Sequence, residues 1–300
     1  MKGRRQMKVV VVGIATHQTS VPVESFPVTY EPLRARTGEI EARAGGPGFV
    51  VARALASLGD VVVMAAPLGE DAAAATVDSQ SYRYGFTTSL CSRTLTRTPR
   101  LVILHDRQGR ESVFTDLGNA LDVTFDEREL SAALVEADAV AMSGPELARA
   151  VAPLARRAGT PFAVDLQQAD APDETVVRDL SGAALLVVDG RAMAGRAHDL
   201  LPELRAHHTA EVVVAVTGRG SAVVLGGGVT APRRVAVGRG EAQTGPGPGS
   251  DDHVPTAGGS SADVFFAALV HRLLALGQEP EQATGEACID TVSVLTALGG

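Results

Sequence analysis

The chain contains no tryptophan and only two cysteines, and aromatic residues make up 4% of its 300 residues. With so few large rings, the core must be built from alanine, valine and leucine. Cys91 and Cys288 form neither a CxxC pair nor a metal-ligand spacing. The sequence therefore argues against a disulfide-stapled fold and fits a reducing compartment.

Lysine is almost missing as well. Lys2 and Lys8 are the only lysines, so the body of the chain offers none for a Schiff base or for a P-loop. Acidic residues outnumber basic residues by 35 to 27, which gives a net charge of −8. This balance argues against a nucleic-acid-binding surface, and we expect no nucleic acid partner.

The sequence lacks a long hydrophobic run near its start. The apolar run after Lys8 covers residues 9–12 and stops at Gly13. It is too short for a signal peptide and far below the roughly 20 residues of a membrane span. We expect a protein without a membrane partner and with a cytoplasmic location.

A chain of 300 residues can form one large α/β domain or two ordinary domains. Short valine-rich runs alternate with segments of helical period, a pattern typical of a doubly wound parallel sheet. The expected strands are residues 9–13, 61–65, 139–143, 162–165, 185–188, 212–216 and 222–225. The clearest expected helices are residues 48–57, 146–157 and 262–276, ending at Gly59, Gly159 and Gly277.

Two segments in the first half read as hairpins instead. They cover about residues 14–43 and 98–116, and the second consists of a strand at 100–105, a turn at 106–109 and a strand at 111–115. Paired into a small sheet over one end of the large sheet, they would form a lid over a substrate. A third irregular stretch, residues 238–259, is rich in glycine and proline, and its composition favours disorder over a functional loop.

Four segments, read in order, carry a family resemblance. They are GGPGFVVARALASLG at 45–59, PLGED at 67–71, YGFTT at 84–88 and DVFFAAL at 263–269. They resemble the signatures of the ribokinase/PfkB family of ATP-dependent sugar and nucleoside kinases. The resemblance covers nearly the whole chain. It implies a single domain, residues 1–300, folded as a three-layer α/β/α sandwich with a mostly parallel central sheet and a small β lid.

Phosphoryl transfer needs a base near the attacking hydroxyl and donors around the transferred phosphate. A carboxylate in the first turn of a helix, preceded by small residues, supplies the base and places backbone N–H groups beside it. Asp263 stands at such a position. The resemblance implies that Asp263 is the base and that Gly259, Ser260, Ser261 and Ala262 form an anion hole, whereas without it Asp263 reads as a helix-capping carboxylate.

The resemblance also implies the remaining site residues, two cofactors and an assembly. ATP and Mg²⁺ are the implied cofactors, a small hydroxylated molecule is the implied substrate, and pairing of lids would permit a homodimer. The implied acceptor residues are His17, Gln18, Gly45, Gly46, Val50 and Gln167. The implied nucleotide residues are Asp189, Thr217, Gly218 and Gly220, with Asp189 also near the metal.

The sequence departs from the family pattern at positions that carry chemistry. Ser260, Ser261 and Ala262 replace Gly-Ala-Gly before the base, Val50 replaces an asparagine, and Gln18 replaces an aspartate. The less polar acceptor pocket would suit a molecule with fewer hydroxyl groups than a sugar. Three functions stay open: an active kinase with an unusual acceptor, a kinase-fold protein that binds a ligand without phosphorylating it, and a repurposed enzyme that uses Asp263 without ATP.

Two other polar clusters are better explained as solvated surface segments than as metal sites. His207 and His208 lie at the expected end of a helix, where a solvated turn is favoured over a metal site. Asp251, Asp252 and His253 belong to the glycine-rich stretch, and a flexible loop is favoured there over a cation site.

Overall fold

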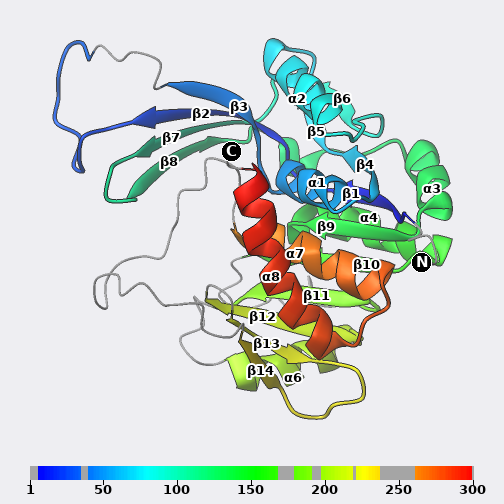
Figure 1. Cartoon of the computed structure of the whole chain (residues 1–300). Coiled ribbons are helices and arrows are strands. Elements are labelled where there is room, and N and C mark those ends of the chain that lie inside the picture. Colours follow the sequence, from blue (N-terminus) through cyan, green and yellow to red (C-terminus); the bar gives the residue numbers. More distant parts are fainter. Residues whose placement is uncertain are drawn as a thin grey trace.

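The computed structural model describes residues 6–34, 40–167, 179–190, 197–218, 221–236 and 261–298. An eight-stranded sheet forms its centre (Figure 1). In sheet order the strands are β14 (Arg233–Ala236), β13 (Ser221–Leu225), β12 (Val212–Gly218), β11 (Leu185–Asp189), β10 (Phe162–Asp165), β9 (Ala139–Ser143), β1 (Lys8–Val12) and β4 (Val61–Ala65). The strands from β12 to β4 are parallel, and β13 and β14 add an antiparallel edge.

The valine-rich strands are buried on both faces of this sheet. In β1, Val9 and Val11 belong to one hydrophobic core, whereas Val10 and Val12 belong to a second. Side chains of a strand point alternately to its two faces, so each face of the sheet has its own core. The expected bounds of β4, β9 and β10 are confirmed.

Helices cover both faces, which completes the predicted three-layer sandwich (Figure 1). One core includes residues of α1 (Pro47–Ser57), α2 (Ala72–Arg83), α7 (Ser261–Val270) and α8 (Pro280–Leu298). The other includes residues of α3 (Glu127–Glu136), α4 (Pro145–Ala158) and α6 (Ala197–His208). A short 3₁₀-helix, η1 (Ala120–Asp122), precedes α3.

The predicted helix ends are confirmed at α1 and α4. Gly59 follows α1 with φ of 97°, and Gly159 caps α4 with φ of 70°, a region that glycine occupies without steric cost. The predicted single helix over residues 262–276 is wrong in one respect. The α-helix ends at Val270 and continues as a π-helix, His271–Ala275, in which Leu276 N–H donates to the His271 carbonyl at 3.2 Å.

The two predicted hairpin segments join one small sheet. Its order is β3 (Glu41–Gly45), β2 (Thr16–Pro22), β7 (Arg100–His105) and β8 (Glu111–Asp116), and it projects from the body in Figure 1. This sheet is the predicted lid. A separate two-stranded sheet pairs β5 (Pro67–Gly69) with β6 (Ser92–Leu95). The division into a single domain with inserted lid segments stays a prediction.

Among the described residues, no helix combines the length and the apolar character needed to span a membrane.

Candidate functional site

The carboxyl ends of the parallel strands meet at one edge of the main sheet, where open α/β sheets bind ligands. Polar residues stand at three of these ends: Ser143 on β9, Asp165 on β10 and Asp189 on β11. The strand register pairs Asp165 with Ser143, and β11 lies next to β10. We call Ser143, Asp165, Gln167 and Asp189 the strand-end cluster.

Hydrogen bonds fix the geometry of the strand-end cluster. The backbone N–H of Gln167 donates to Asp165 Oδ1 at 2.9 Å, and Gln167 Nε2 donates to Ser143 Oγ at 3.3 Å. The N–H of Asp189 donates to the Gln167 carbonyl at 3.1 Å. Gln167 has φ of 57°, an uncommon value for a residue with a side chain. The chain after β10 thus turns sharply and brings the Gln167 amide to the end of β9.

The Asp165 carboxyl has an unusual protonation equilibrium. Burial raises its pKa to about 7, the hydrogen bond from Gln167 acts against this shift, and the nearby charge of Asp189 adds to it. Both side chains are buried. Two carboxylates that share a poorly solvated edge favour either a bound proton or a bound cation.

The predicted acceptor loop lies beside this edge because two glycines allow helix α1 to approach β1. A Cβ on Gly48 would lie 2.6 Å from the carbonyl carbon of Gly13, closer than real Cβ contacts. Gly46, with φ of 86°, precedes the helix, and Gly48 N–H donates to the Ile14 carbonyl at 2.9 Å. The first turn of α1 is therefore fixed against the end of β1, with Val50 buried in the core.

Gln18 lies against this loop. A Cβ on Gly45 would overlap the Gln18 carboxamide, so glycine is required at position 45 for Gln18 to hold its place. Residues 17 and 18 are neighbours on β2, and neighbouring strand residues face opposite sides of a sheet. The structure therefore groups Gln18, Gly45 and Gly46, and it places the His17 side chain on the opposite face.

The predicted base lies in the first turn of α7. Asp263 is buried, and α7 packs on α1 and on strands β9, β10 and β11. His271 Nδ1, just after α7, lies 2.8 Å from Oδ2 of Asp60, just after α1. Because their last turns lie side by side, the two helices run in the same direction. Their first turns, with Asp263 and Gly48, therefore lie at the same end, next to the strand ends.

The predicted anion hole and nucleotide turn fall only partly within the described residues. Ser261 and Ala262 open α7, whereas Gly259 and Ser260 lie outside the described ranges. On the nucleotide side, Thr217 and Gly218 end β12, and Thr217 Oγ1 lies 3.1 Å from Ser221 Oγ on β13. Gly220 and the residues 251–253 also lie outside the described part of the chain.

Two arginines near the acceptor loop were not predicted from the sequence. Arg43 on β3 pairs directly with Gln18, and Arg53 on α1 is buried with 5% of its surface exposed. The sequence signal was a charged residue inside the otherwise apolar run of residues 48–56. Its position on the helix becomes informative only when the packing of α1 is known.

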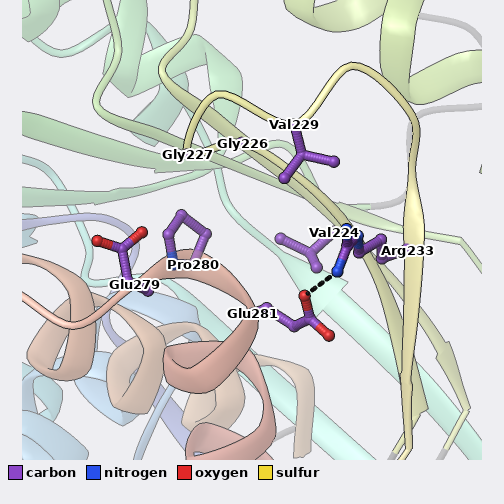
Figure 2. Close-up of a pocket in the computed structure, with 8 residues that line it drawn as sticks. All are labelled: Val224, Gly226, Gly227, Val229, Arg233, Glu279, Pro280 and Glu281. Atoms are coloured by element: carbon purple, nitrogen blue, oxygen red, sulfur yellow. Dashed lines mark hydrogen bonds and ion pairs between the residues drawn. The ribbon is translucent and has the colours of Figure 1, made fainter.

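One hollow in the described part of the chain lies away from this site. A cavity of about 110 Å³ lies between the turn after β13 and the start of α8, where Arg233 pairs with Glu281 at 3.0 Å (Figure 2). Because β13 is antiparallel to β12, this cavity lies at the edge opposite the strand-end cluster. In the described ranges, the structure has no group of three or more His, Cys, Asp or Glu side chains arranged to hold a metal ion.

The model of the family described as "pfkB family carbohydrate kinase" matches residues 6–237. A comparison with the curated proteins gives no match.

Solved structures with the same fold include several kinases. A microbiome-derived acarbose kinase has a TM-score of 0.79 and 22% sequence identity, over 99% of this chain and 94% of that chain. Arabidopsis thaliana ribokinase complexed with ribose and ATP has a TM-score of 0.72 and 17% identity, over 97% and 99% of the two chains. Trypanosoma brucei brucei adenosine kinase has a TM-score of 0.70 and 13% identity, over 97% and 99%. These likenesses confirm the predicted ribokinase-like fold.

Proposed function

Because the chain belongs to the PfkB family of carbohydrate kinases, we propose that it transfers a phosphoryl group from ATP to a hydroxyl group of a sugar, a nucleoside or a related small molecule. The observation that carries this proposal is the place of Asp263. It is buried in the first turn of α7, and that turn lies at the same end of the helix pair as the glycine loop of α1. A base, a helix N-terminus and an acceptor loop are thereby brought together.

In the proposed reaction, Asp263 accepts the proton of the acceptor hydroxyl as its oxygen attacks the γ-phosphorus. The bond from that phosphorus to its bridging oxygen breaks, and ADP leaves with the electron pair. The backbone N–H groups at the start of α7, including those of Ser261 and Ala262, meet the charge on the transferred group. Gln18, Gly45 and Gly46 would line the acceptor side, and Thr217 and Gly218 the nucleotide side, whereas Val50 belongs to the core.

The strand-end cluster fits a magnesium ion. Mg²⁺ is usually held by one or two carboxylates together with waters and substrate phosphates, and Asp165 and Asp189 supply two carboxylates. The raised pKa of Asp165 supports this fit, since a cation would relieve the repulsion between the two side chains. Bound there, the ion would neutralise part of the charge on the ATP phosphates.

A second candidate is a protein of the same fold that binds its ligand without phosphorylating it. Ala262, immediately before Asp263, carries a Cβ where the family signature has glycine. A side chain at that place hinders the close approach of a phosphate to the backbone. A repurposed enzyme that uses Asp263 as an acid or base without ATP is a third outcome of the same test.

The test replaces Asp263 by asparagine and follows ADP formation with a panel of acceptors. A general base contributes about 10²- to 10⁴-fold, so we expect kcat to fall by that factor while the circular dichroism spectrum stays unchanged. Asp122→Asn is the matched control, because Asp122 is an exposed aspartate of η1 away from the site. Retained turnover in Asp263→Asn would overturn the role of the base.

Calorimetry with ATP and magnesium separates the candidates. Heat of nucleotide binding together with ADP formation supports the kinase. Nucleotide binding without ADP formation for any acceptor supports a binding protein, and absence of nucleotide binding supports chemistry without ATP.

We also propose a homodimer through the lid. Val102 on β7 and Phe114 on β8 pair across the sheet on one face, with 39% and 59% of their surfaces exposed. Neighbouring apolar side chains that stay exposed favour association with a second copy.

A further inference from the structure

The segment PLGED at residues 67–71 ends on Asp71, and this carboxylate receives hydrogen bonds from two parts of the chain. Asp71 caps helix α2 by accepting the Ala74 N–H at 3.0 Å. It also accepts the N–H of Thr98 at 3.2 Å and the Thr98 hydroxyl at 2.7 Å, and Arg100 Nη2 donates to it at 3.2 Å. Because Arg100 begins β7, Asp71 joins α2 to the first residue of a lid strand.

The Asp71 carboxylate keeps its charge near neutral pH. Partial burial acts to raise its pKa, but the hydrogen bonds from Thr98, Ala74 and Arg100 outweigh burial and lower the pKa to about 2. Thr98 is buried, and its hydroxyl also accepts the Gly69 N–H of β5 at 3.0 Å. The junction of β5, α2 and β7 therefore stays hydrogen-bonded at any pH at which the protein would be assayed.

A second side chain of α2 contacts the other side of the lid. Gln80 Oε1 accepts the Ala44 N–H of β3 at 3.1 Å, and α2 packs against β3 and β2 (Figure 1). Ala44 is buried, and a buried N–H needs a partner. Since β3 is an edge strand of the lid, Ala44 finds this partner on a helix of the body.

The two contacts stand on both sides of strand β2, which carries Gln18. The order in the lid is β3, β2, β7, so both neighbours of β2 are bonded to the same helix. Asp71 and Gln80 stand nine positions apart, about 13 Å along a helix. A sheet held at one point can pivot about it, whereas two points at this spacing also fix its angle.

The acceptor loop, Gly45 and Gly46, is held at both of its ends. Ala44, bonded to Gln80, comes directly before it, and the Gly48 N–H, bonded to the Ile14 carbonyl at 2.9 Å, follows it. The Gln18 carboxamide fills the space that a Cβ on Gly45 would need. A displacement of Ala44 would therefore move both the loop and its contact with Gln18.

We propose that Gln80 and Asp71 are positioning residues of the acceptor site, and that α2 acts through them to hold β2 and the Gly45–Gly46 loop in the binding arrangement. The proposal rests on the proposed function for the role of this loop. A loop that is already in place binds its ligand without a loss of ordering entropy. Removal of either contact returns that loss to the binding of the acceptor.

The first test measures the Gln80 contact without turnover. Gln80→Met keeps the side-chain length and a residue that favours helices, but removes the acceptor oxygen. The loss of one hydrogen bond changes an equilibrium constant by about two- to tenfold. Amide hydrogen exchange in peptides covering residues 41–46, followed by mass spectrometry, should therefore speed up by that factor. Gln80→Glu retains an acceptor oxygen and should exchange like the wild type, and a wild-type rate in Gln80→Met would overturn the proposal.

The second test measures turnover with ribose and with adenosine, one sugar and one nucleoside. For the better acceptor, Gln80→Met should raise the acceptor KM by about two- to tenfold and leave the KM for ATP unchanged. Gln80→Glu should restore the acceptor KM. A merely structural role would reduce the amount of folded enzyme, which lowers kcat and leaves both KM values unchanged. That pattern would overturn the proposal.

The Asp71 contact has its own variant. Asparagine is as good a helix cap as aspartate but lacks the charge that holds Arg100, so Asp71→Asn should speed up exchange over residues 98–103 and raise the same KM. Asp126→Asn is the matched control, since Asp126 caps α3 by accepting the Glu129 N–H at 2.9 Å. Gln282→Met, in α8, is the control for Gln80→Met. Effects on the lid or the acceptor KM as large in these controls would overturn the proposal.

Two outcomes separate this proposal from the proposed function. If exchange over residues 41–46 depends on Gln80 but the wild-type protein phosphorylates neither probe, the hold of α2 on the loop stands and the kinase activity toward these acceptors fails. If the wild-type protein phosphorylates a probe and the acceptor KM does not depend on Gln80, the kinase stands and the positioning role is overturned.

Discussion

Replacement of Asp165 by asparagine should remove a large part of the pH dependence of stability. An aspartate titrates near 3.8 when unfolded, and burial raises its pKa in the folded chain to about 7. Between these values the folded state binds the proton more tightly than the unfolded state, so the free energy of unfolding falls as pH rises. A shift of about three units corresponds to about 4 kcal/mol.

Below about pH 4 the carboxyl is protonated in both states, and its stabilising contribution is complete. As pH rises toward 7 the contribution is lost, at a limit of about 1.4 kcal/mol per pH unit. Above pH 7 the folded protein carries the buried charge beside Asp189, and the loss is complete. An asparagine keeps an oxygen to accept the Gln167 N–H bond and has no proton to lose.

Urea unfolding followed by far-ultraviolet circular dichroism measures the difference, since the chain has no tryptophan to report by fluorescence. The stability of Asp165→Asn minus that of the wild type should rise by about 3 kcal/mol from pH 5 to pH 8, because about two of the three pKa units fall in that range. Asp122→Asn, on the surface, should give a flat difference. A flat difference for Asp165→Asn as well would refute the placement of a buried, proton-binding carboxyl at the end of β10.

Three other changes test the packing and the assembly. Gly48→Ala should lower the free energy of unfolding in urea by about 1–3 kcal/mol, because its Cβ meets Gly13. The control Gly285→Ala lies inside α8 with its nearest contact at 3.4 Å, and it should be neutral or stabilise by up to about 1 kcal/mol. Equal losses of stability in the two variants would contradict this prediction. His271→Ala should cost about 2–4 kcal/mol by leaving a buried carboxyl without its 2.8 Å partner, and unchanged thermal stability would count against that pair. Phe114→Glu should convert the proposed lid dimer to a monomer in light scattering, and an unchanged dimer mass would exclude this interface.

The main sheet was predictable because its strands are continuous apolar runs. Strands β4, β9 and β10 begin and end where the sequence predicts. The runs of β4 and β9 each follow an aspartate, Asp60 and Asp138, and the run of β10 follows Pro161. The lid was predictable from alternation and from the turn at residues 106–109. Helix α2 was not predicted, because four alanines and a run of polar residues leave its buried face without large apolar side chains.

The π-helix after α7 depends on a tertiary contact that no local pattern reveals. The sequence continues with helix-forming residues through Leu276, and the periodicity predicts one unbroken helix. His271 instead bonds Asp60, 211 residues away in the chain. Long-range hydrogen bonding of this kind outweighs a local propensity of a few tenths of a kcal/mol per residue.

The family signatures indicated a candidate site, and the strand register decides which of its residues lie together. The structure places Gln18 against Gly45, next to Gly46. The register of β2 against β3 separates His17 from that group and adds Arg43 to it.

Basic and acidic side chains lie on different sides of the candidate site. No lysine follows Lys8, so arginines and the N-terminus of α7 must supply the positive charge on the protein. Arg43 lies on β3 opposite Gln18, and Arg53 is buried in α1. The carboxylates of Asp165 and Asp189 stand on the strand-end side and suit a cation. If magnesium binds there, its addition should lower the pKa of Asp165 and reduce the loss of stability between pH 5 and pH 8. The variant Asp165→Asn should show no such gain, and an equal gain in both proteins would place the metal elsewhere.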